Sequence, residues 1–256
     1  MRYKLTLEYD GTHFFGWQVQ RKTGERTVQG CLETALGNLP GMTPTAWAAG
    51  RTDRGVHALA MVAHCDGDGR FAPDKLQRAV NAHLPPDVRV LEVDQVADNF
   101  HAQYDCHFRQ YVYQMRLVRG DLTGTALERH FALHLHQTLD IAAMQAAAPL
   151  FAGEHDFAAL ATQETRETVR EVFLSQLEHD RFELRYHVAA GGFLRNMVRA
   201  MVGTLLSVGE GKLAAEDVLT VISSKDRAKA GVNVPPHGLY FVRASYMPFV
   251  KQNSNS

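Results

Sequence analysis

Residues 45–65 read TAWAAGRTDRGVHALAMVAHC, and the fold is best derived outward from this stretch. Two apolar runs, 45–49 and 59–65, have the length and composition of β-strands. The loop between them, GRTDRGVHA at 50–58, places Asp53 between two arginines and has a glycine on each side. Because glycine permits sharp turns at positive φ, the sequence predicts two strands joined by a tightly held, charged loop.

Apolar periodicity on both sides of this stretch predicts the same order of elements twice. The first half has the order βαββαβ, with strands at 3–9, 45–49, 59–65 and 88–93 and helices at 28–39 and 74–84. The second half repeats it with one additional helix: strands at 109–118, 169–177, 182–188 and 239–246 and helices at 139–150, from 193, and at 214–222. Two ferredoxin-like units have this order.

The predicted fold class is therefore α+β. Two ferredoxin-like βαββαβ halves would be joined into one extended antiparallel sheet, with helices on one face and a central cleft. We expect a domain at 1–105 that carries the Asp53 loop and a domain at 106–250 that carries Tyr111 and Arg199. Residues 251–256, KQNSNS, have the composition of a disordered tail.

Composition limits the possible functions. The 256 residues are 45% hydrophobic and 21% charged with a net charge of -1, so any contact with nucleic acid must come from a local basic patch. The three cysteines form no CxxC pair and are expected to be reduced thiols. Since we find neither an export signal nor a membrane span, we expect a cytoplasmic protein.

The charge pattern around Asp53 has two interpretations. Neighbouring guanidinium groups of Arg51 and Arg54 favour the ionised carboxylate, which suits a nucleophile better than a proton donor. Alternatively, an arginine and Asp53 form a structural pair that pins a tight turn. Spacing alone leaves both open.

Two further segments carry candidate site residues. Strand alternation places Tyr111, Tyr113 and Met115 on one face, where Tyr111 is either core packing or a stacking platform for an RNA base. Helical spacing in FLRNMVR at 193–199 places Arg195 and Arg199 on one stripe, and the small Gly203 beside them allows another backbone to approach closely. A solvated helix face is the alternative for the arginines.

Taken together, these segments resemble the tRNA pseudouridine synthase A family, whose loop usually reads GRTDAGVHA. Other segments resemble that family's motifs in the same order: YDG at 9–11, GWQVQ at 16–20, NAHLPPD at 81–87, FHA at 100–102, GEHDF at 153–157, FLRNMVR at 193–199, AG at 230–231 and GLY at 238–240. The resemblance implies the pseudouridine synthase fold with a central RNA-binding cleft. It also implies a homodimer without cofactor or metal that isomerises uridines 38, 39 and 40 of the tRNA anticodon stem-loop.

The resemblance further implies roles for single residues. Asp53 stands at the position of the catalytic aspartate, Tyr111 at that of the tyrosine that stacks on the uracil, and Arg199 at that of the arginine paired with the aspartate. Arg51 matches the loop arginine that meets RNA. Three further candidates for RNA contact, with solvated surface arginines as the alternative, are Arg21, Arg54 and Arg195.

The chain departs from the family pattern at three positions. Arg54 replaces the usual alanine and adds positive charge beside Asp53, Gln103 replaces an arginine, and Met61 replaces a frequent glutamine. The first could add a phosphate contact and the second could remove one. We expect activity to be retained, and these departures leave the exact tRNA preference open.

Two functions of other classes compete with this interpretation. A non-catalytic RNA-binding module would show aromatic residues on several strands and would not need Asp53. A hydrolase would place a second carboxylate or a metal cluster near Asp53. The histidines, of which 130, 134 and 136 or 101 and 107 are the closest to a ligand set, have no known metal-ligand spacing.

Overall fold

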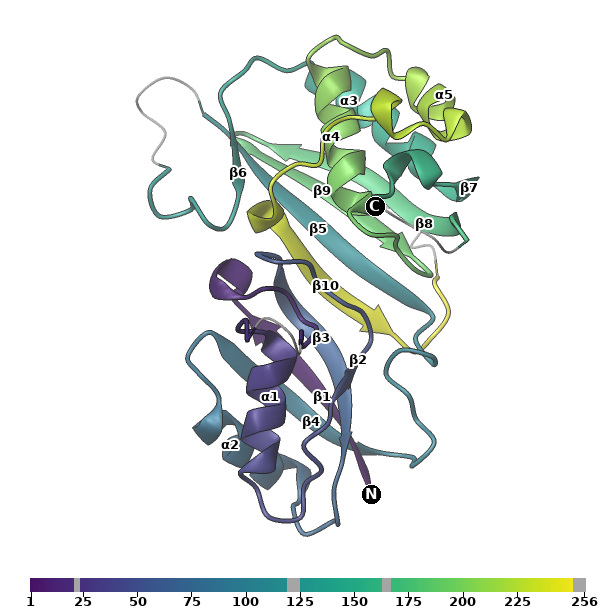
Figure 1. The fold of residues 1–256 in the computed structure, drawn as a ribbon. Helices are drawn as coiled ribbons and strands as arrows, with labels where there is room; N and C mark the ends of the chain where they lie inside the picture. Colours follow the sequence, from purple (N-terminus) through teal and green to yellow (C-terminus); the bar gives the residue numbers. More distant parts are fainter. Residues whose placement is uncertain (21–23, 119–124, 163–166, 251–256) are drawn as a thin grey trace. The chain divides into compact units, whose positions relative to one another are not determined.

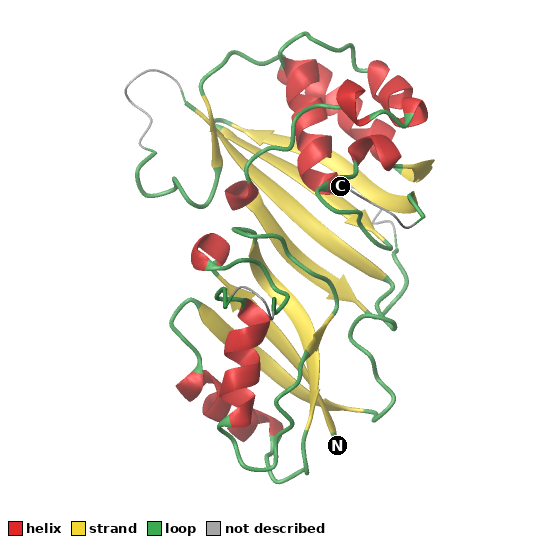
Figure 2. Cartoon of the chain, in the orientation of Figure 1, coloured by secondary structure: helices red, strands yellow, loops and turns green. Residues whose placement is uncertain are grey.

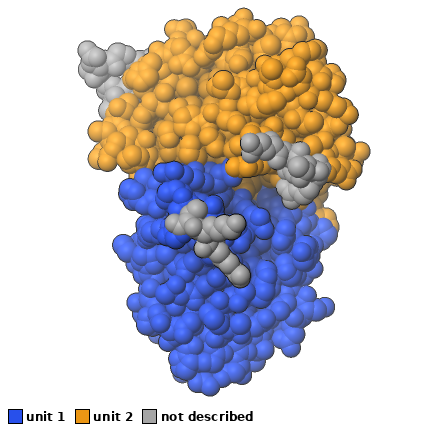
Figure 3. Space-filling view, viewed as in Figure 1, with its two compact units in different colours: residues 1–109, 240–247 blue, residues 110–239, 248–256 orange. Residues whose placement is uncertain are grey.

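The chain forms two units, and each is built from two separate stretches of sequence. Unit 1 contains residues 1–109 and 240–247, and unit 2 contains residues 110–239 and 248–256 (Figure 3). The structure is a computed structural model that describes residues 1–20, 24–118, 125–162 and 167–250. Both Arg21 and the expected tail at 251–256 lie outside these ranges.

Unit 1 has the βαββαβ order that the sequence predicts (Figure 1). Its elements are β1 (Arg2–Tyr9), α1 (Val28–Gly37), β2 (Trp47–Ala48), β3 (His57–Asp66), α2 (Pro73–His83) and β4 (Val88–Val96). The strands have the order β4-β1-β3, and β1 is antiparallel to both neighbours. This is the arrangement of a ferredoxin-like unit.

The outer edge of β3 is shared by two different strands. Short β2 pairs antiparallel with its far end, at Ala63 and His64. The near end, at His57 and Ala58, pairs in parallel with β10 (Leu239–Ser245), which belongs to unit 1 from Tyr240 onward. The prediction of a wholly antiparallel sheet is therefore wrong at this edge, because a strand from residues 239–245 pairs in parallel with β3 at His57 and Ala58.

Alternation along β1 separates the two faces of the unit 1 sheet. Tyr3, Leu5, Leu7 and Tyr9 are buried, whereas the residues between them are half-buried or exposed. Helix α2 packs against β4 and against α1, and the buried residues of both helices are apolar. One apolar face per strand is what a sheet covered by helices on a single side requires.

Unit 2 combines a further set of strands with three helices. After β5 (Phe108–Leu117) come β6 (Leu133–Leu135), α3 (Ile141–Ala147), β7 (Gly153–Asp156), β8 (Val169–Asp180), β9 (Glu183–Ala190), α4 (Met197–Gly209) and α5 (Asp217–Ser224). The strands have the order β5-β9-β8-β7, and β6 joins β5 in parallel. Figure 2 shows the three helices as a layer beside these strands. The pairing in the described residues is thus mixed and mostly antiparallel, and no described helix has the length and apolarity to cross a membrane.

Helix α4 begins four residues later than the predicted helix from 193. Asn196 has a φ of 63°, in the left-handed region, so the backbone at 191–196 cannot continue the helix toward its N-terminus. Arg195 consequently lies before the helix, while Arg199 and Gly203 lie in it. The predicted stripe of Arg195 and Arg199 on one helix face is wrong.

The predicted close approach at Gly203 is confirmed. A Cβ atom added to Gly203 would lie 1.8 Å from the carbonyl oxygen of Val232, and one added to Gly231 would lie 2.1 Å from the carbonyl carbon of Gly203. The hydroxyl of Thr204 accepts a hydrogen bond from the Gly231 N–H at 3.0 Å. The segment at 230–234 therefore crosses α4 at backbone contact.

Replacing Gly203 by alanine should force α4 away from this segment. We expect Gly203→Ala to lower the free energy of unfolding in urea by about 1 to 3 kcal/mol, because the added methyl overlaps backbone that has no rotamer with which to move aside. Gly37→Ala in α1 is the control, since its Cβ would lie 3.4 Å from Pro44 Cβ, an ordinary contact. Equal stability of the two variants would contradict the prediction.

Candidate active site

The loop that carries Asp53 lies between β2 and β3 in unit 1. Thr52 is buried, Asp53 is half-buried, and both Arg51 and Arg54 are exposed. Strand β3 already begins at His57, two residues earlier than predicted. The motif GRTDRGVHA thus ends inside β3, and Asp53 lies four residues before the start of that strand.

The segment at 9–17, which we call the opening motif, holds this loop by hydrogen bonds. The Trp17 N–H donates to the Thr52 carbonyl at 3.0 Å, and the Gly55 N–H donates to the Phe14 carbonyl at 3.2 Å. The hydroxyls of Tyr9 and Thr52 lie 2.8 Å apart in the core. Three bonds from one segment therefore fix the backbone on both sides of Asp53.

Two glycines allow the opening motif to approach so closely. Gly16 has a φ of +88°, and a Cβ on it would lie 2.5 Å from the Thr52 carbonyl oxygen. A Cβ on Gly11 would lie 2.1 Å from the Val56 carbonyl oxygen. Any side chain at either position would push the loop outward.

His57 links the end of the loop to two other segments. Its buried ring accepts a hydrogen bond at Nδ1 from the Gly11 N–H at 3.0 Å and stacks on Tyr240 with a centroid distance of 4.8 Å. The same Nδ1 lies 3.2 Å from Oδ1 of Asp10. The imidazole thus joins the loop to the opening motif and to β10.

The side-chain contacts around Asp53 bear on the ion pair with a neighbouring arginine, which spacing alone left open. Within the described residues of unit 1, the Asp53 carboxylate forms no ion pair with Arg51 or Arg54. Its carbonyl oxygen accepts a hydrogen bond from the Val56 N–H at 3.1 Å, which closes the turn. The guanidinium of Arg54 lies instead over the ring of Phe15, 4.2 Å from the centroid. Backbone bonds, rather than a salt bridge, hold the turn.

Tyr111 and Tyr113 lie on β5 in unit 2, and their surroundings differ. Tyr113 is fully buried and donates a hydrogen bond to the Pro235 carbonyl at 2.7 Å, and burial raises the pKa of its phenol well above the usual range. Tyr111 keeps 8% of its surface exposed and meets the ring of Phe193 edge-on at 5.1 Å. Tyr113 is therefore a core residue, whereas Tyr111 keeps a small exposed fraction.

Arg199 is held by its own unit at two nitrogens. Nε donates to the Val234 carbonyl at 2.6 Å, and an Nη atom donates to Oδ1 of Asn196 at 2.9 Å. Val234 belongs to the segment that crosses α4 at Gly203. The guanidinium is thus oriented by the same crossing that positions the helix.

Sequence reasoning missed the supporting residues of the loop. Arg109 was not among the candidates, yet its guanidinium donates to the Ala49 carbonyl at 3.0 and 2.8 Å, directly before the loop. Tyr9 and Thr52 were assigned no role. The paired glycines at 11 and 16 were the available signal, because they predict backbone contact without naming the partner.

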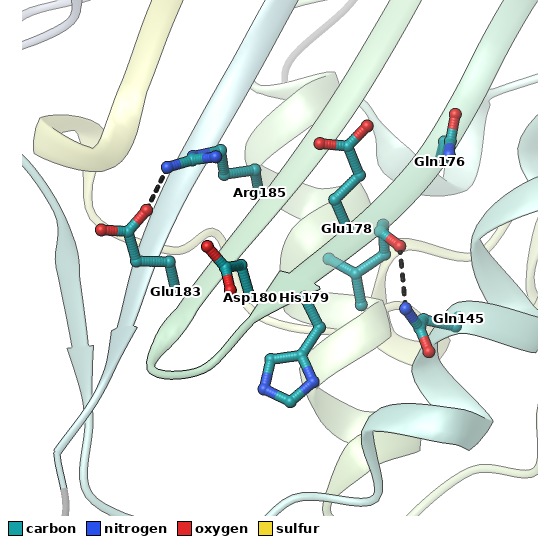
Figure 4. Close-up of a pocket in the computed structure, with 8 residues that line it drawn as sticks. Gln145, Gln176, Glu178, His179, Asp180, Glu183 and Arg185 are labelled. Carbon is teal, nitrogen blue, oxygen red and sulfur yellow. Dashed lines mark hydrogen bonds and ion pairs between the residues drawn. The ribbon is translucent and has the colours of Figure 1, made fainter.

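The hydrolase alternative calls for a metal cluster near Asp53. Among the described residues, no three His, Cys, Asp or Glu side chains are grouped so that they could hold a metal ion. A cavity of about 390 Å³ lies at the β8–β9 hairpin of unit 2 (Figure 4). None of the predicted site residues lines this cavity. Its polar and charged lining residues are Gln145, Gln176, Glu178, His179, Asp180, Glu183 and Arg185.

Comparison with known proteins covers nearly the whole chain. A family model described as tRNA pseudouridine synthase matches residues 6–105 and 147–247. Proteins named tRNA pseudouridine synthase A are similar over 96% of this chain: one of Solidesulfovibrio magneticus is 43% identical over 91% of its own length, and one of Thermus thermophilus is 44% identical over 96%. Asp53 and Arg199 lie in the matched ranges of the family model, and Tyr111 lies between them.

One solved structure is a much more distant match. The structure titled "Crystal Structure of a Cbf5-Nop10-Gar1 Complex" aligns with 93% of this chain and 48% of that chain, with 13% identity and a TM-score of 0.37. This similarity is too low to support a conclusion.

The hydrogen bond between Tyr9 and Thr52 should be measurable as a coupling. We expect Tyr9→Phe and Thr52→Val each to lower the free energy of unfolding and to show a coupling energy of about 1 kcal/mol in a double-mutant cycle, because each leaves the other buried hydroxyl without its partner. Tyr246→Phe, which removes a bond to the Ala102 carbonyl in the same unit, is the control and should combine additively with Thr52→Val. A coupling near zero for the first pair would show that the hydroxyls do not interact.

Proposed function

The chain belongs to the tRNA pseudouridine synthase family and is an isomerase that forms pseudouridine; on that premise we propose that Asp53 acts on a flipped-out uridine at positions 38, 39 and 40 of the anticodon stem-loop. The reaction breaks the bond from N1 to C1′, turns the uracil and joins C5 to C1′. The C5 proton is released and N1 gains one, so atoms balance without a cofactor. A base must leave its stack before its sugar bond can be reached.

The observation that carries this proposal is the construction of the Asp53 loop. The opening motif fixes the backbone on both sides of the aspartate, while the carboxylate itself has no ion-pair partner in the described part of unit 1. A nucleophile needs this combination, because a positioned group without competing contacts reaches its target at small entropic cost. Asp53 either attacks C1′ or acts as a base at the sugar.

Three further residues have proposed roles in the same reaction. Tyr111 stacks on the extruded uracil with the face of its ring and helps to remove the C5 proton. Arg199, already oriented by Val234 and Asn196, pairs with Asp53 and stabilises the charge that develops during bond cleavage. Arg51, exposed at the start of the loop, contacts the RNA backbone.

The proposal extends to assembly and location. We propose that the two units join their strands into one extended sheet with a central RNA-binding cleft, that Arg195 contacts tRNA on its rim together with Arg21, and that the protein acts as a cytoplasmic homodimer. The exposed position of Arg195 before α4 supports its role. The cysteines, of which none forms a disulfide, are consistent with a reducing compartment.

Asp53→Asn tests the nucleophile directly. Because an amide neither attacks C1′ nor accepts the proton, we expect loss of tritium release from tRNA labelled at C5 of uridine, while tRNA binds within about tenfold of wild type. The control is Asp94→Asn, which neutralises a carboxylate of the same unit that pairs with Lys4. Turnover by the Asp53→Asn variant would exclude the proposed role of Asp53. If the wild-type protein binds tRNA but shows no turnover, the non-catalytic RNA-binding module is favoured instead.

Arg199→Lys tests the charge that we assign to α4. Lysine keeps the charge but cannot bond both Val234 and Asn196 in one plane, so we expect kcat to fall roughly a hundredfold with a smaller change in KM. Arg116→Lys is the matched control, since this arginine of unit 2 pairs with Glu128 and Glu183. An unchanged kcat for Arg199→Lys would remove Arg199 from the mechanism.

A further inference from the structure

We infer that Arg54 binds a phosphate group of the RNA strand next to the target nucleotide and that Phe15 holds it in place for this contact. The inference rests on the proposed function, because it takes Asp53 as the group that meets the target nucleotide. It assigns a phosphate contact to Arg54, which stands where the loop of the family usually has alanine.

The first argument is the geometry of the pair. The guanidinium carbon of Arg54 lies 4.2 Å above the ring centroid of Phe15, within the distance of a cation–π contact. Phe15 is itself fixed, because its N–H donates to the Arg26 carbonyl at 2.9 Å and it precedes the tightly packed Gly16. A cation–π contact does not use up the N–H donors of a guanidinium, so they stay available for another partner.

The second argument is the charge of Arg54. This side chain is exposed, and among the residues that the structure describes it has neither a carboxylate partner nor a hydrogen-bond acceptor. A planar guanidinium with unused N–H donors matches two oxygens of a phosphate. The position therefore offers a charged, oriented and unneutralised donor.

A neighbouring pair in the same unit shows the contrast. Arg26 lies over Phe14 at 4.1 Å, almost the same geometry, but both of its terminal nitrogens donate to Asp87 at 2.7 Å. The bond to Arg26 keeps the pKa of the Asp87 carboxyl below its ordinary value, so this pair remains neutral overall. Of these two arginines on consecutive phenylalanines, only Arg54 has no acid to match it.

The third argument is proximity to the reacting nucleotide. Consecutive Cα atoms are about 3.8 Å apart, so a nucleotide whose C1′ meets Asp53 brings its own flanking phosphates within reach of the Arg54 side chain. Phosphate contacts position a strand without reading its bases. Arg54 should therefore raise affinity for every tRNA substrate by a similar factor.

The experiment measures how tRNA affinity depends on salt. The Kd of an unmodified tRNA transcript is measured between about 50 and 200 mM salt for wild type, Arg54→Ala, Arg54→Lys and Phe15→Leu. For Arg54→Ala we expect Kd to rise several-fold at low salt and the slope of log Kd against log salt to fall by about 0.7 to 0.9, the loss of one phosphate contact.

The other variants separate charge from orientation. Arg54→Lys should keep the wild-type slope, and Phe15→Leu should keep it while raising Kd, because the charge remains but its support is lost. Arg78→Ala removes an exposed arginine that Asp74 already neutralises and should leave the slope unchanged. If Arg54→Ala loses its folded spectrum, Arg54→Gln is measured in its place.

Two results would overturn the inference. A wild-type slope in Arg54→Ala would show that no phosphate contact was lost, and an equal change in Arg78→Ala would show that only the total charge matters. Tritium release by the wild-type protein tests the proposed function separately. A protein with an Arg54-dependent slope and no tritium release would fail that function while this contact stands.

Discussion

Contact between two stretches of backbone, without room for a single methyl group, is the constraint on which unit 1 depends. The opening motif touches the loop at Gly11 and Gly16, and the two carbonyl groups that a Cβ would strike belong to Thr52 and Val56. These carbonyls lie on either side of Asp53. A rigid strand end and a rigid turn therefore determine where the carboxylate stands, and its own side chain contributes nothing to holding the loop.

Unit 2 uses the same device for its arginine. Gly203 and Gly231 bring a connecting segment onto α4 at backbone distance, and Val234 at the end of that segment receives the Nε hydrogen bond of Arg199. Both proposed catalytic groups thus lie beside close glycine contacts that fix the neighbouring backbone. Local positioning of this kind suits a protein whose total charge is close to zero and whose RNA contacts must be local.

Much of this could be predicted from particular residues. The apolar runs beside GRTDRGVHA predicted the central strands, the family resemblance is confirmed by the match over residues 6–105 and 147–247, and the smallness of Gly203 predicted its backbone contact.

The start of α4 could not be predicted, because the left-handed backbone of Asn196 is a local choice that leaves no periodicity signal. Spacing left open whether Asp53 pairs with a neighbouring arginine, because it does not show where adjacent side chains in a turn point; in the structure Arg54 lies over Phe15. The parallel place of β10 next to β3 depends on residues nearly two hundred positions apart, which no local pattern records.

That last strand affects how the protein is made. Unit 1 holds the first 109 residues, but Tyr240, on which the His57 ring stacks, is synthesised long after them. Domains tend to fold as units while the chain emerges from the ribosome. The part of β3 next to the Asp53 loop, at His57 and Ala58, therefore has no β10 partner until residues 240–241 have been translated, and a product truncated before them has no complete first unit.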